Sequence, residues 1–417
     1  MSGKGKEGRV PQIRFAGFTD PWEQRKLGEV ATSFDYGLNA AATEYDGKHK
    51  YLRITDIDDE THEFLERDLT TPLVDLEASA GYLLKEGDLL FARTGASVGK
   101  TYLYRQYDGT VYFAGFLIRA RIDKNANPEF VYQTTLTNAY RKYVAVTSQR
   151  SGQPGVNAQE YADFQIMLPS KTEQLQIGTT LRSLDSLITL HQHKYDKLCE
   201  VKKSMLDKMF PKGGSLYPEI RFAGFTDPWE QRKLGELARR VTRKNTERES
   251  DLPLTISAQY GLIDQRVFFN NQVASKDMSG YFLLRKGEFA YNKSTSSDSP
   301  WGAIKRLVKY DKGCVSTLYI CFELLEADPD YLVTYYETNR WHNAVQLIAA
   351  EGARNHGLLN IAPDDFFETQ LTIPSNRAEQ ARIGSCFMQL DHLITLHQRK
   401  LELLRNIKRA MLDKMFA

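Results

Sequence analysis

Residues 13–29 read IRFAGFTDPWEQRKLGE, and residues 220–236 repeat these seventeen letters without a change. Two further segments return at nearly the same distance, namely LITLHQ from Leu187 and Leu393 and MLDKMF from Met205 and Met411. The separations are 207, 206 and 206 residues (220 − 13, 393 − 187 and 411 − 205), about half of the 417-residue chain. A repeat of this length predicts two copies of one domain-sized unit rather than a solenoid of short repeats.

Between the shared segments the two copies diverge, over residues 30–168 and 237–373. Both are expected to mix short strands with helices, because apolar runs alternate with Gly and Asp turns. The expected strands are Tyr51–Ile54, Asp88–Ala92, Tyr102–Tyr104 and Phe116–Ile122, then Leu254–Ser257, Glu288–Tyr291 and Leu318–Leu324. One helix is expected from about Pro128 to Val144 and another from about Pro329 to Leu347. Because repeated segments flank two divergent ones, the sequence suggests that the chain binds the same partner at two equivalent sites. The divergent segments would then recognise two different targets.

Each copy ends in a long helix with a coiled-coil pattern. Apolar residues recur in alternating steps of four and three, a spacing that keeps one apolar stripe facing a partner helix. The predicted seam consists of Ile177, Leu181, Leu184 and Ile188 in the first copy and Ile383, Phe387, Leu390 and Ile394 in the second. Because the chain runs globule, helix, globule, helix, the two helices are expected to pack antiparallel. The alternative is that they mediate oligomerisation.

The stripes also contain one histidine each, His191 and His397. A histidine in a helix seam is more often packed and hydrogen-bonded than bound to metal, so no metal site is predicted. The expected fold class is α+β, with two pseudo-symmetric globular domains and two long antiparallel coiled-coil helices. The expected divisions are residues 1–168 and 213–373 for the globular parts, each with its shared segment, and 169–212 and 374–417 for the helices.

The composition indicates a folded protein. It has 55 Lys+Arg against 53 Asp+Glu, a formal charge of +2, and 41% hydrophobic residues, which disfavours disorder. The N-terminus, MSGKGKEGRV, has no apolar stretch behind it, and no run of about 18 apolar residues occurs anywhere. The four cysteines (Cys199, Cys314, Cys321 and Cys386) are scattered without CxxC spacing. We therefore expect reduced thiols and a cytoplasmic location.

Catalytic motifs are not found. The segment Gly95–Thr101, GASVGKT, is one residue short of a phosphate-binding loop, and the TYLYR that follows looks like a strand instead of the required helix. The Asn/Asp-Pro-Pro-Tyr motif of adenine methyltransferases is absent, and so is an FxGxG motif for S-adenosylmethionine. Asp330 and Glu337 resemble a nuclease carboxylate pair, but Asn339 stands where a lysine is wanted. We expect no catalytic residues.

Polar and basic loops follow the strands in both copies. Arg can read guanine and Asn or Gln can read adenine, while Ser, Thr, Lys and exposed amides typically contact phosphate. In the first copy the candidate DNA-binding residues are Arg93, Thr94, Ser97, Lys100, Gln149, Arg150, Ser151 and Gln153. In the second copy they are Asn292, Lys293, Ser294, Ser296, Arg354, Asn355 and His356. For any one residue, an ordinary surface loop is an equally good interpretation.

With these features the chain resembles the specificity subunit of type I restriction–modification systems. The resemblance covers essentially the whole chain and rests on four elements: the duplicated FAGFTDPWEQRKLGE, the Leu-Lys-x-Gly-Asp before Arg93-Thr94-Gly95, the Ser151-Gly152-Gln153 loop, and the two terminal helices. It implies two target recognition domains, each reading one half of a split DNA sequence. It also implies that the helices act as a ruler and dock two methyltransferase subunits.

The resemblance further implies that this chain holds no cofactor. S-adenosylmethionine would belong to the methyltransferase subunit, and ATP and Mg²⁺ to the restriction subunit of the full complex. The partners would be double-stranded DNA and these subunits, with no membrane. The competing hypotheses are a self-contained methyltransferase or nuclease and a coiled-coil scaffold that binds only proteins. Because the charge is near neutral and phosphate neutralisation drives much of DNA affinity, the isolated chain is expected to bind DNA weakly.

Overall fold

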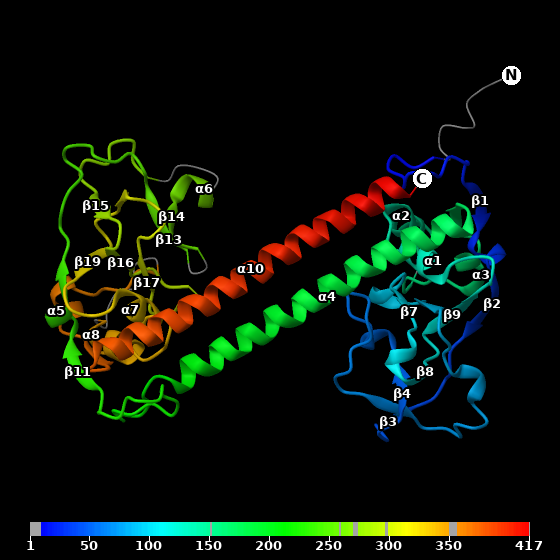
Figure 1. Cartoon of the computed structure of the whole chain (residues 1–417), viewed down its shortest axis with the longest axis horizontal. Coiled ribbons are helices and arrows are strands. Elements are labelled where there is room, and N and C mark those ends of the chain that lie inside the picture. The colour runs from blue at the N-terminus through cyan, green and yellow to red at the C-terminus, as the bar shows by residue number, and fades with distance from the viewer. Residues whose placement is uncertain are drawn as a thin grey trace. The chain divides into compact units, whose positions relative to one another are not determined.

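The computed structural model describes residues 10–150, 152–257, 260–269, 274–296, 299–349 and 357–416 (Figure 1). The chain forms two compact units. The first unit comprises residues Met1–Lys194 and His397–Ala417, and the second comprises Tyr195–Leu396. Each unit therefore holds one globular part together with a portion of both long helices. In the part of the chain that the structure describes, no helix combines the length and apolar composition needed to cross a membrane.

The first unit is built around a four-stranded antiparallel sheet with strand order β2-β9-β6-β7. Its strands are β2 (Ala31–Tyr36), β9 (Leu117–Ile122), β6 (Asp88–Ala92) and β7 (Thr101–Leu103). Every residue of β6 is buried, as expected for a central strand in an apolar core. Three smaller pairs complete the strands: β1 (Glu23–Lys26) with β10 (Gln165–Leu168), β3 (Ala42–Glu44) with β5 (Thr70–Pro72), and β4 (His49–Leu52) with β8 (Thr110–Phe113).

The helix expected from Pro128 to Val144 is two helices, so that prediction was wrong. They are α1 (Pro128–Thr134) and α2 (Asn138–Thr147). The hydroxyls of Thr134, Thr135 and Thr137 each donate to the carbonyl oxygen three residues earlier, at 2.6–2.7 Å. Thr137 then caps α2 by accepting a hydrogen bond from the backbone N–H of Tyr140. Threonine favours such local bonds over a continuous helix.

The remaining short helices of the first unit lie between its strands. They are α3 (Ala158–Ala162) and the 3₁₀ turns η1 (Leu27–Glu29), η2 (Ile54–Asp56), η3 (Ala80–Tyr82), η4 (Gly95–Ser97) and η5 (Gln106–Asp108). The turn η4 is followed by the strand β7, which confirms that GASVGKT does not open a helix.

The second unit repeats this plan with a different sequence. Its central antiparallel sheet has strand order β12-β19-β16-β17, made of β12 (Ala238–Arg240), β19 (Ile320–Leu324), β16 (Phe289–Asn292) and β17 (Ala303–Arg306). The smaller pairs are β11 (Glu230–Lys233) with β20 (Gln370–Ile373), β13 (Leu254–Ser257) with β14 (Gly261–Asp264), and β15 (Phe282–Arg285) with β18 (Lys312–Val315). Its short helices are α5 (Leu234–Leu237), α6 (Gln265–Phe269), α7 (Pro329–Tyr335), α8 (His342–Ile348) and α9 (Pro363–Phe367).

The helix expected from Pro329 to Leu347 is thus also split, into α7 and α8. The break falls at the same place as in the first unit. The Thr338 hydroxyl donates to the carbonyl oxygen of Tyr335, and the indole N–H of Trp341 donates to that of Tyr336. Both globular parts therefore carry a short helix pair at the same point of the fold.

The two long helices are α4 (Lys171–Lys208) and α10 (Arg377–Met415), with 38 and 39 residues. In the first unit Asp185 pairs with Lys408 at 2.5 Å, and the Nδ1 atoms of His191 and His397 lie 2.8 Å apart. The earlier residue of α4, Asp185, thus faces the later residue of α10, Lys408, and the later residue of α4, His191, faces the earlier residue of α10, His397. The portions of the two helices in this unit therefore pack antiparallel, as expected. The histidines are packed and hydrogen-bonded, also as expected.

The start of each predicted seam packs mainly on the globular part of its own copy. Ile177 and Leu181 are buried in the core of the first unit, with Leu184 packed against it. Ile383 and Phe387 lie in the core of the second unit, with Leu390 at its margin. The remaining two members, Ile188 and Ile394, are buried and half-buried respectively.

Each core is completed by the end of the other copy's helix. Leu412 and Met415 of α10 belong to the first core, and Phe416 stacks on Phe130 with ring centres 5.3 Å apart. In the second core Phe210, which follows α4, stacks on Tyr331 at 5.8 Å. The repeated MLDKMF segment of each copy therefore packs into the core of the other copy's globular part, and we call this segment the apolar plug.

The repeated seventeen-residue segment holds these ends in place. Arg14 donates two hydrogen bonds to the buried carboxylate of Glu173 in the first turn of α4, at 2.6 and 2.7 Å. The neighbouring Ile13 N–H donates to the carbonyl oxygen of Lys414, near the end of α10, at 2.9 Å. In the second unit Arg221 binds Glu379, and Ile220 binds Lys208, in the same way. We call this arrangement the clasp.

Candidate nucleic-acid interface

In the first unit, three chain segments meet at one edge of the central sheet, which we call the loop edge. Strand β9 runs antiparallel to both β2 and β6, so the ends of β2 and β6 lie beside the start of β9. Tyr36 ends β2, Arg93 directly follows β6, and Phe116 directly precedes β9. The backbone N–H of Arg93 donates to the carbonyl oxygen of Phe116 at 3.0 Å, which fixes this meeting point.

The second predicted loop joins the same edge. The backbone N–H of Val156 donates to the carbonyl oxygen of Arg93 at 2.9 Å, and that of Gly95 donates to Pro154 at 3.0 Å. Gly95 has a φ of +71°, and a Cβ there would lie 2.9 Å from Nε2 of Gln153. The positive φ and this close approach both favour glycine. The structure therefore brings Arg93, Thr94 and Gln153 together at the loop edge.

Arg93 is held over an aromatic ring. Its guanidinium carbon lies 5.0 Å from the ring centre of Tyr36, and Nη1 is 3.5 Å from the carbonyl oxygen of Gly115. The hydroxyl of Tyr36 accepts a hydrogen bond from the backbone N–H of Ala158 at 3.2 Å. Within the described residues Arg93 has no carboxylate partner, so its charge and most of its donors remain available. A guanidinium stacked on an aromatic face loses less side-chain freedom when it binds.

Two exposed aromatic residues at this edge were not predicted from the sequence as candidate binding residues. Tyr36 is 45% exposed and Phe116 is 59% exposed, although both are large and apolar. In the second unit the residue in the place of Phe116, directly before Tyr319 and β19, is Leu318, which is 55% exposed. No motif marks these positions, because their significance comes from strand pairing and not from local sequence.

Other predicted residues of the first copy are engaged within the protein. Nζ of Lys100 donates to the carbonyl oxygen of Ile57 and forms an ion pair with Asp59. Arg150 pairs with Glu160 and donates to the carbonyl oxygens of Thr147 and Gln149. Gln149 is exposed and Ser97 is half-buried. Ser151 lies outside the described residues.

The second unit forms the same edge with different side chains. The backbone N–H of Leu359 donates to the carbonyl oxygen of Lys293 at 3.0 Å, as Val156 does to Arg93 in the first unit. Ser294 pairs with Leu358 in an isolated bridge, and Ser296 is exposed. The Oδ1 of Asn292 accepts from the backbone N–H of Ser294 at 3.1 Å.

Lys293 points into the protein. Its Nζ donates to the carbonyl oxygen of Ile361 at 3.1 Å, and burial lowers its pKa from the ordinary lysine value. The remaining predicted residues of this copy, Arg354, Asn355 and His356, lie outside the described residues. The two units thus share the backbone of the loop edge and differ in the polar groups that it presents.

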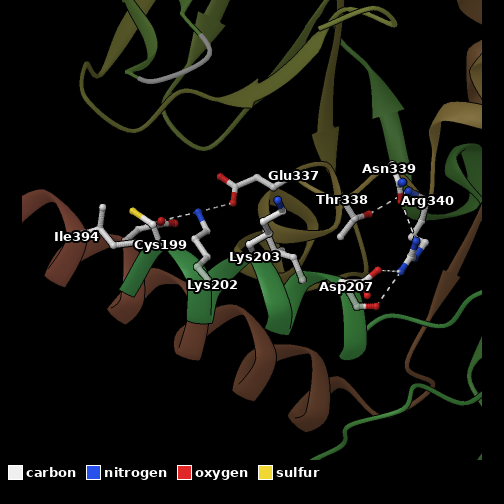
Figure 2. Close-up of a pocket in the computed structure, with 11 residues that line it drawn as sticks. Cys199, Lys202, Lys203, Asp207, Glu337, Thr338, Asn339, Arg340 and Ile394 are labelled. Atoms are coloured by element: carbon white, nitrogen blue, oxygen red, sulfur yellow. Dashed lines mark hydrogen bonds and ion pairs between the residues drawn. The ribbon is translucent and has the colours of Figure 1, made fainter. Parts of the chain in front are cut away.

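The carboxylates that resembled a nuclease pair are bound to basic groups. Asp330 pairs with Arg306 at 2.5 Å. Glu337 pairs with Lys202 of α4 at 2.7 Å (Figure 2) and with Lys305 at 3.8 Å. In the described part of the chain, no group of three or more His, Cys, Asp or Glu side chains is arranged to hold a metal ion.

Comparison with known proteins agrees with this architecture. Residues 19–200 match the model of the type I restriction modification DNA specificity domain. A putative type I restriction enzyme MjaX specificity subunit of Methanocaldococcus jannaschii is 23% identical over 237 residues, which are 55% of this chain and 56% of that protein. The type I restriction enzyme MjaVIII specificity subunit of the same organism is 22% identical over 241 residues, which are 56% of this chain and 52% of that protein. The matched part thus spans about half the length of these curated relatives.

A solved structure shows the same fold over the whole chain. The S subunit of a type I restriction-modification system from M. genitalium superposes with a TM-score of 0.64, covering 98% of this chain and 99% of its own, at 11% sequence identity. The chain is thus similar over residues 19–200 to the type I restriction modification DNA specificity domain, and over nearly its whole length it has the fold of that S subunit.

Proposed function

We propose that this chain is the DNA sequence-recognition subunit of a type I restriction–modification complex. Each globular part reads one half of an asymmetric, bipartite target, and the long helices set the gap between the halves. The observation that carries this proposal is the loop edge, which has the same backbone in both units but presents Arg93 in one and Asn292 with Ser294 in the other. Different polar groups on one scaffold are what two different half-sites require.

The constant parts of the chain support a second role, the docking of two methyltransferase subunits. The long helices repeat exposed residues as well as buried ones, since Leu187 and Leu190 of α4 and their counterparts Leu393 and Leu396 of α10 are all exposed, whereas the loop edges differ between the copies. A surface that occurs twice with the same residues suits one partner bound twice. This chain would direct adenine methylation and restriction without catalysing either. S-adenosylmethionine would then belong to the methyltransferase subunits, and ATP and Mg²⁺ to the restriction subunits.

DNA binding by the assembled complex tests the proposal. The isolated chain, with a net charge of +2, should shift a duplex weakly, and the complex with methyltransferase subunits should shift it tightly and with sequence preference. Both measurements need the same salt concentration, because phosphate contacts are strongly salt-dependent. A complex with equal affinity for all duplexes would favour a protein scaffold. Methylation by the isolated chain with added S-adenosylmethionine would favour a self-contained enzyme.

A further inference from the structure

An exposed apolar side chain lies at the tip of a tight turn in the loop edge of each unit. In the first unit residues 114–117 form this turn, and the backbone N–H of its last residue donates to the carbonyl oxygen of its first residue at 2.9 Å. In the second unit residues 316–319 form the same turn, closed by the same hydrogen bond at 3.1 Å. Phe116 and Leu318 stand at the third position of these turns, and we call them the tip residues.

The two turns have no residue in common, yet both keep a large apolar side chain at the tip. The first turn reads AGFL and the second reads STLY, so all four positions differ. Phe116 is 59% exposed and Leu318 is 55% exposed. One exposed apolar residue on a protein surface needs no explanation. Its recurrence at the same position of two divergent domains indicates a function that requires an apolar group there.

The backbone around each tip residue is braced. The carbonyl oxygen of Phe116 accepts a hydrogen bond from the backbone N–H of Arg93 at 3.0 Å, and the carbonyl oxygen of Gly115 lies 3.5 Å from Nη1 of Arg93. In the second unit the hydroxyl oxygen of Ser316 accepts a hydrogen bond from the backbone N–H of Leu318 at 3.3 Å. The tip residues are therefore held in place before a ligand arrives, which lowers the entropic cost of binding.

In the first unit the tip residue lies beside the best candidate for base reading. Because Phe116 and Arg93 are hydrogen-bonded across neighbouring strands, their backbones are about 4.8 Å apart. Successive base pairs of a duplex are about 3.4 Å apart along the helix axis. The side chain of Phe116 can therefore reach the base pair that Arg93 contacts or the one next to it.

The second unit places its tip residue among polar candidates in the same way. Tyr291 of β16 pairs with Ile320 of β19. If this register continues by two residues, Leu318 lies beside the chain between Asn292 and Ser294. Each tip residue thus adds an apolar group to a set of hydrogen-bonding groups.

The major groove of DNA presents one kind of apolar group to such a set. The base edges there carry hydrogen-bond donors and acceptors, and thymine alone adds a C5-methyl group. Apolar side chains, including phenylalanine, recognise thymine by contact with that methyl group.

We infer that Phe116 and Leu318 each contact the C5-methyl group of a thymine, so that each half-site contains one thymine recognised through its methyl group. This inference rests on the proposed function and adds to it one base in each half of the target. In the half-site of the first unit, this thymine lies in the base pair that Arg93 contacts or in an adjacent one.

Insertion between base pairs is the competing role for an exposed apolar side chain at a DNA interface. A side chain that enters the base stack needs both of its faces free, whereas Phe116 is only 59% exposed and part of its surface lies against the protein. Contact with a methyl group needs one free face and leaves the duplex stacked. A protein partner shared by both units is disfavoured because the two turns have no residue in common.

The test removes single methyl groups from the DNA. The complex of the full chain with its methyltransferase subunits is titrated with the duplex that it methylates, in which each thymine in turn is replaced by deoxyuridine. Deoxyuridine keeps the pairing and hydrogen-bonding groups of thymine and lacks only the methyl group. At one position in each half-site the replacement should weaken binding about fourfold, the factor that corresponds to the burial of one methyl group.

Substitution of a tip residue should abolish this difference in one half-site only. Phe116→Ala should bind thymine and deoxyuridine equally in the half-site of the first unit and keep the difference in the other, and Leu318→Ala should do the reverse. Phe116→Leu, which places the tip residue of the second unit in the first, should keep both differences. The comparison on the unchanged complex decides the inference by itself if an alanine variant fails to assemble.

Two exposed residues at the opposite end of the sheets provide matched controls. Tyr107 and Val308 follow β7 and β17, whose ends lie beside the starts of β6 and β16 and therefore away from the loop edges. Tyr107→Ala and Val308→Ala should keep both differences between thymine and deoxyuridine.

The inference is overturned if no deoxyuridine in either half-site weakens binding, or if Phe116→Ala keeps both differences. It is also overturned if 2-aminopurine in a half-site brightens on binding, the signal disappears in Phe116→Ala, and thymine and deoxyuridine bind equally, because the ring would then enter the base stack. In these cases the complex still prefers its own target, and the proposed function stands. A complex that binds all duplexes equally would contradict the proposed function and the inference together.

Discussion

The guanidinium of Arg93 lies over the ring of Tyr36, with 5.0 Å between the guanidinium carbon and the ring centre. This stacking orients a side chain that has no carboxylate partner among the described residues, at the edge where two predicted loops meet. An arginine that is fixed in this way can donate both hydrogen bonds that distinguish guanine in the major groove. The pair is the most defined candidate for base reading in the first unit.

Substitution of Arg93 should therefore change the base preference within one half-site. Arg93→Ala should weaken binding to the best target by about 1–3 kcal/mol, the usual contribution of a bidentate contact to a base, and should relax the preference at one guanine. Tyr36→Leu should have a smaller effect in the same direction. Competition binding by the assembled complex on targets substituted base by base would measure this.

Tyr36→Phe is the matched control, because it keeps the ring under Arg93 and removes only the hydroxyl. It should retain the preference for the guanine. If Arg93→Ala lowers affinity equally for all sequences, Arg93 contacts phosphate and the assignment to base reading is wrong.

The clasp should carry much of the stability of each unit. Glu173 is fully buried and Arg14 nearly so, and removing one partner of a buried ion pair leaves the other charge without compensation. Arg14→Ala should destabilise the first unit by about 3–5 kcal/mol. Arg25→Ala, which breaks an exposed pair with Glu23, should cost less than about 1 kcal/mol. Denaturant unfolding of the two variants tests this, and equal losses would contradict it.

A substitution at the C-terminal end of one copy should lower the stability of the core of the other copy. Phe416→Ala removes a ring that stacks on Phe130 and lies edge-on to Trp22, so it should destabilise the first unit by roughly 2–4 kcal/mol. Phe210→Ala should do the same to the second unit through its contacts with Trp229 and Tyr331. Hydrogen exchange resolved by peptide would locate each loss. Protection lost near the substituted residue alone, with the adjoining core unchanged, would refute the exchange of helix ends.

The long helices should determine the number of bases between the two half-sites and not the base sequence of either half-site. Seven residues inserted into the seam region of 177–205, with seven inserted at the corresponding place in α10, preserve the apolar stripe. The matched insertion is needed because Asp185 pairs with Lys408 and Lys202 pairs with Asp391 at equivalent positions. The methylated sequence should keep both half-sites and change the number of bases between them. Altered half-site bases with an unchanged gap would contradict the claim that the long helices set the spacing of the two half-sites.

The facing histidines should make the first unit sensitive to acid. Burial lowers the pKa values of both His191 and His397, and the positive charges of Lys194 and Lys400 lower them further. Because the unfolded chain then binds more protons than the folded chain below about pH 6.5, stability should fall as the pH drops from 7 towards 5. His397→Gln should make that dependence shallower. Thermal melting across this range measures it, and an identical dependence in the variant would refute the role of the pair.

Part of this architecture was predictable from the sequence. The letter-for-letter repeat and the step of three and four residues led to two copies and two long helices, and the apolar run Asp88–Ala92 matches β6 residue for residue. These features depend on local periodicity. The split of each helix pair was missed because threonine hydroxyls bond to the backbone at positions that an apolar pattern treats as helical.

The long-range features were not predictable in the same way. The exchange of helix ends depends on which surface each MLDKMF segment buries, and the two segments are identical in sequence. The positions of Tyr36 and Phe116 at the loop edge arise from strand pairing between residues far apart in the chain. Among the loop residues, the structure brings Arg93, Thr94 and Gln153 together, while Lys100 and Arg150 are bound to carboxylates of the chain.

The most direct test of the account is to map adenine methylation across a host genome by single-molecule sequencing, with and without this chain. With the chain and its methyltransferase subunit present, methylation should mark one asymmetric sequence with two unlike halves and a fixed gap, and without the chain that mark should disappear. Arg93→Ala should change one half of the sequence and leave the other half and the gap intact. Methylation that is the same with and without the chain would contradict its role in sequence recognition.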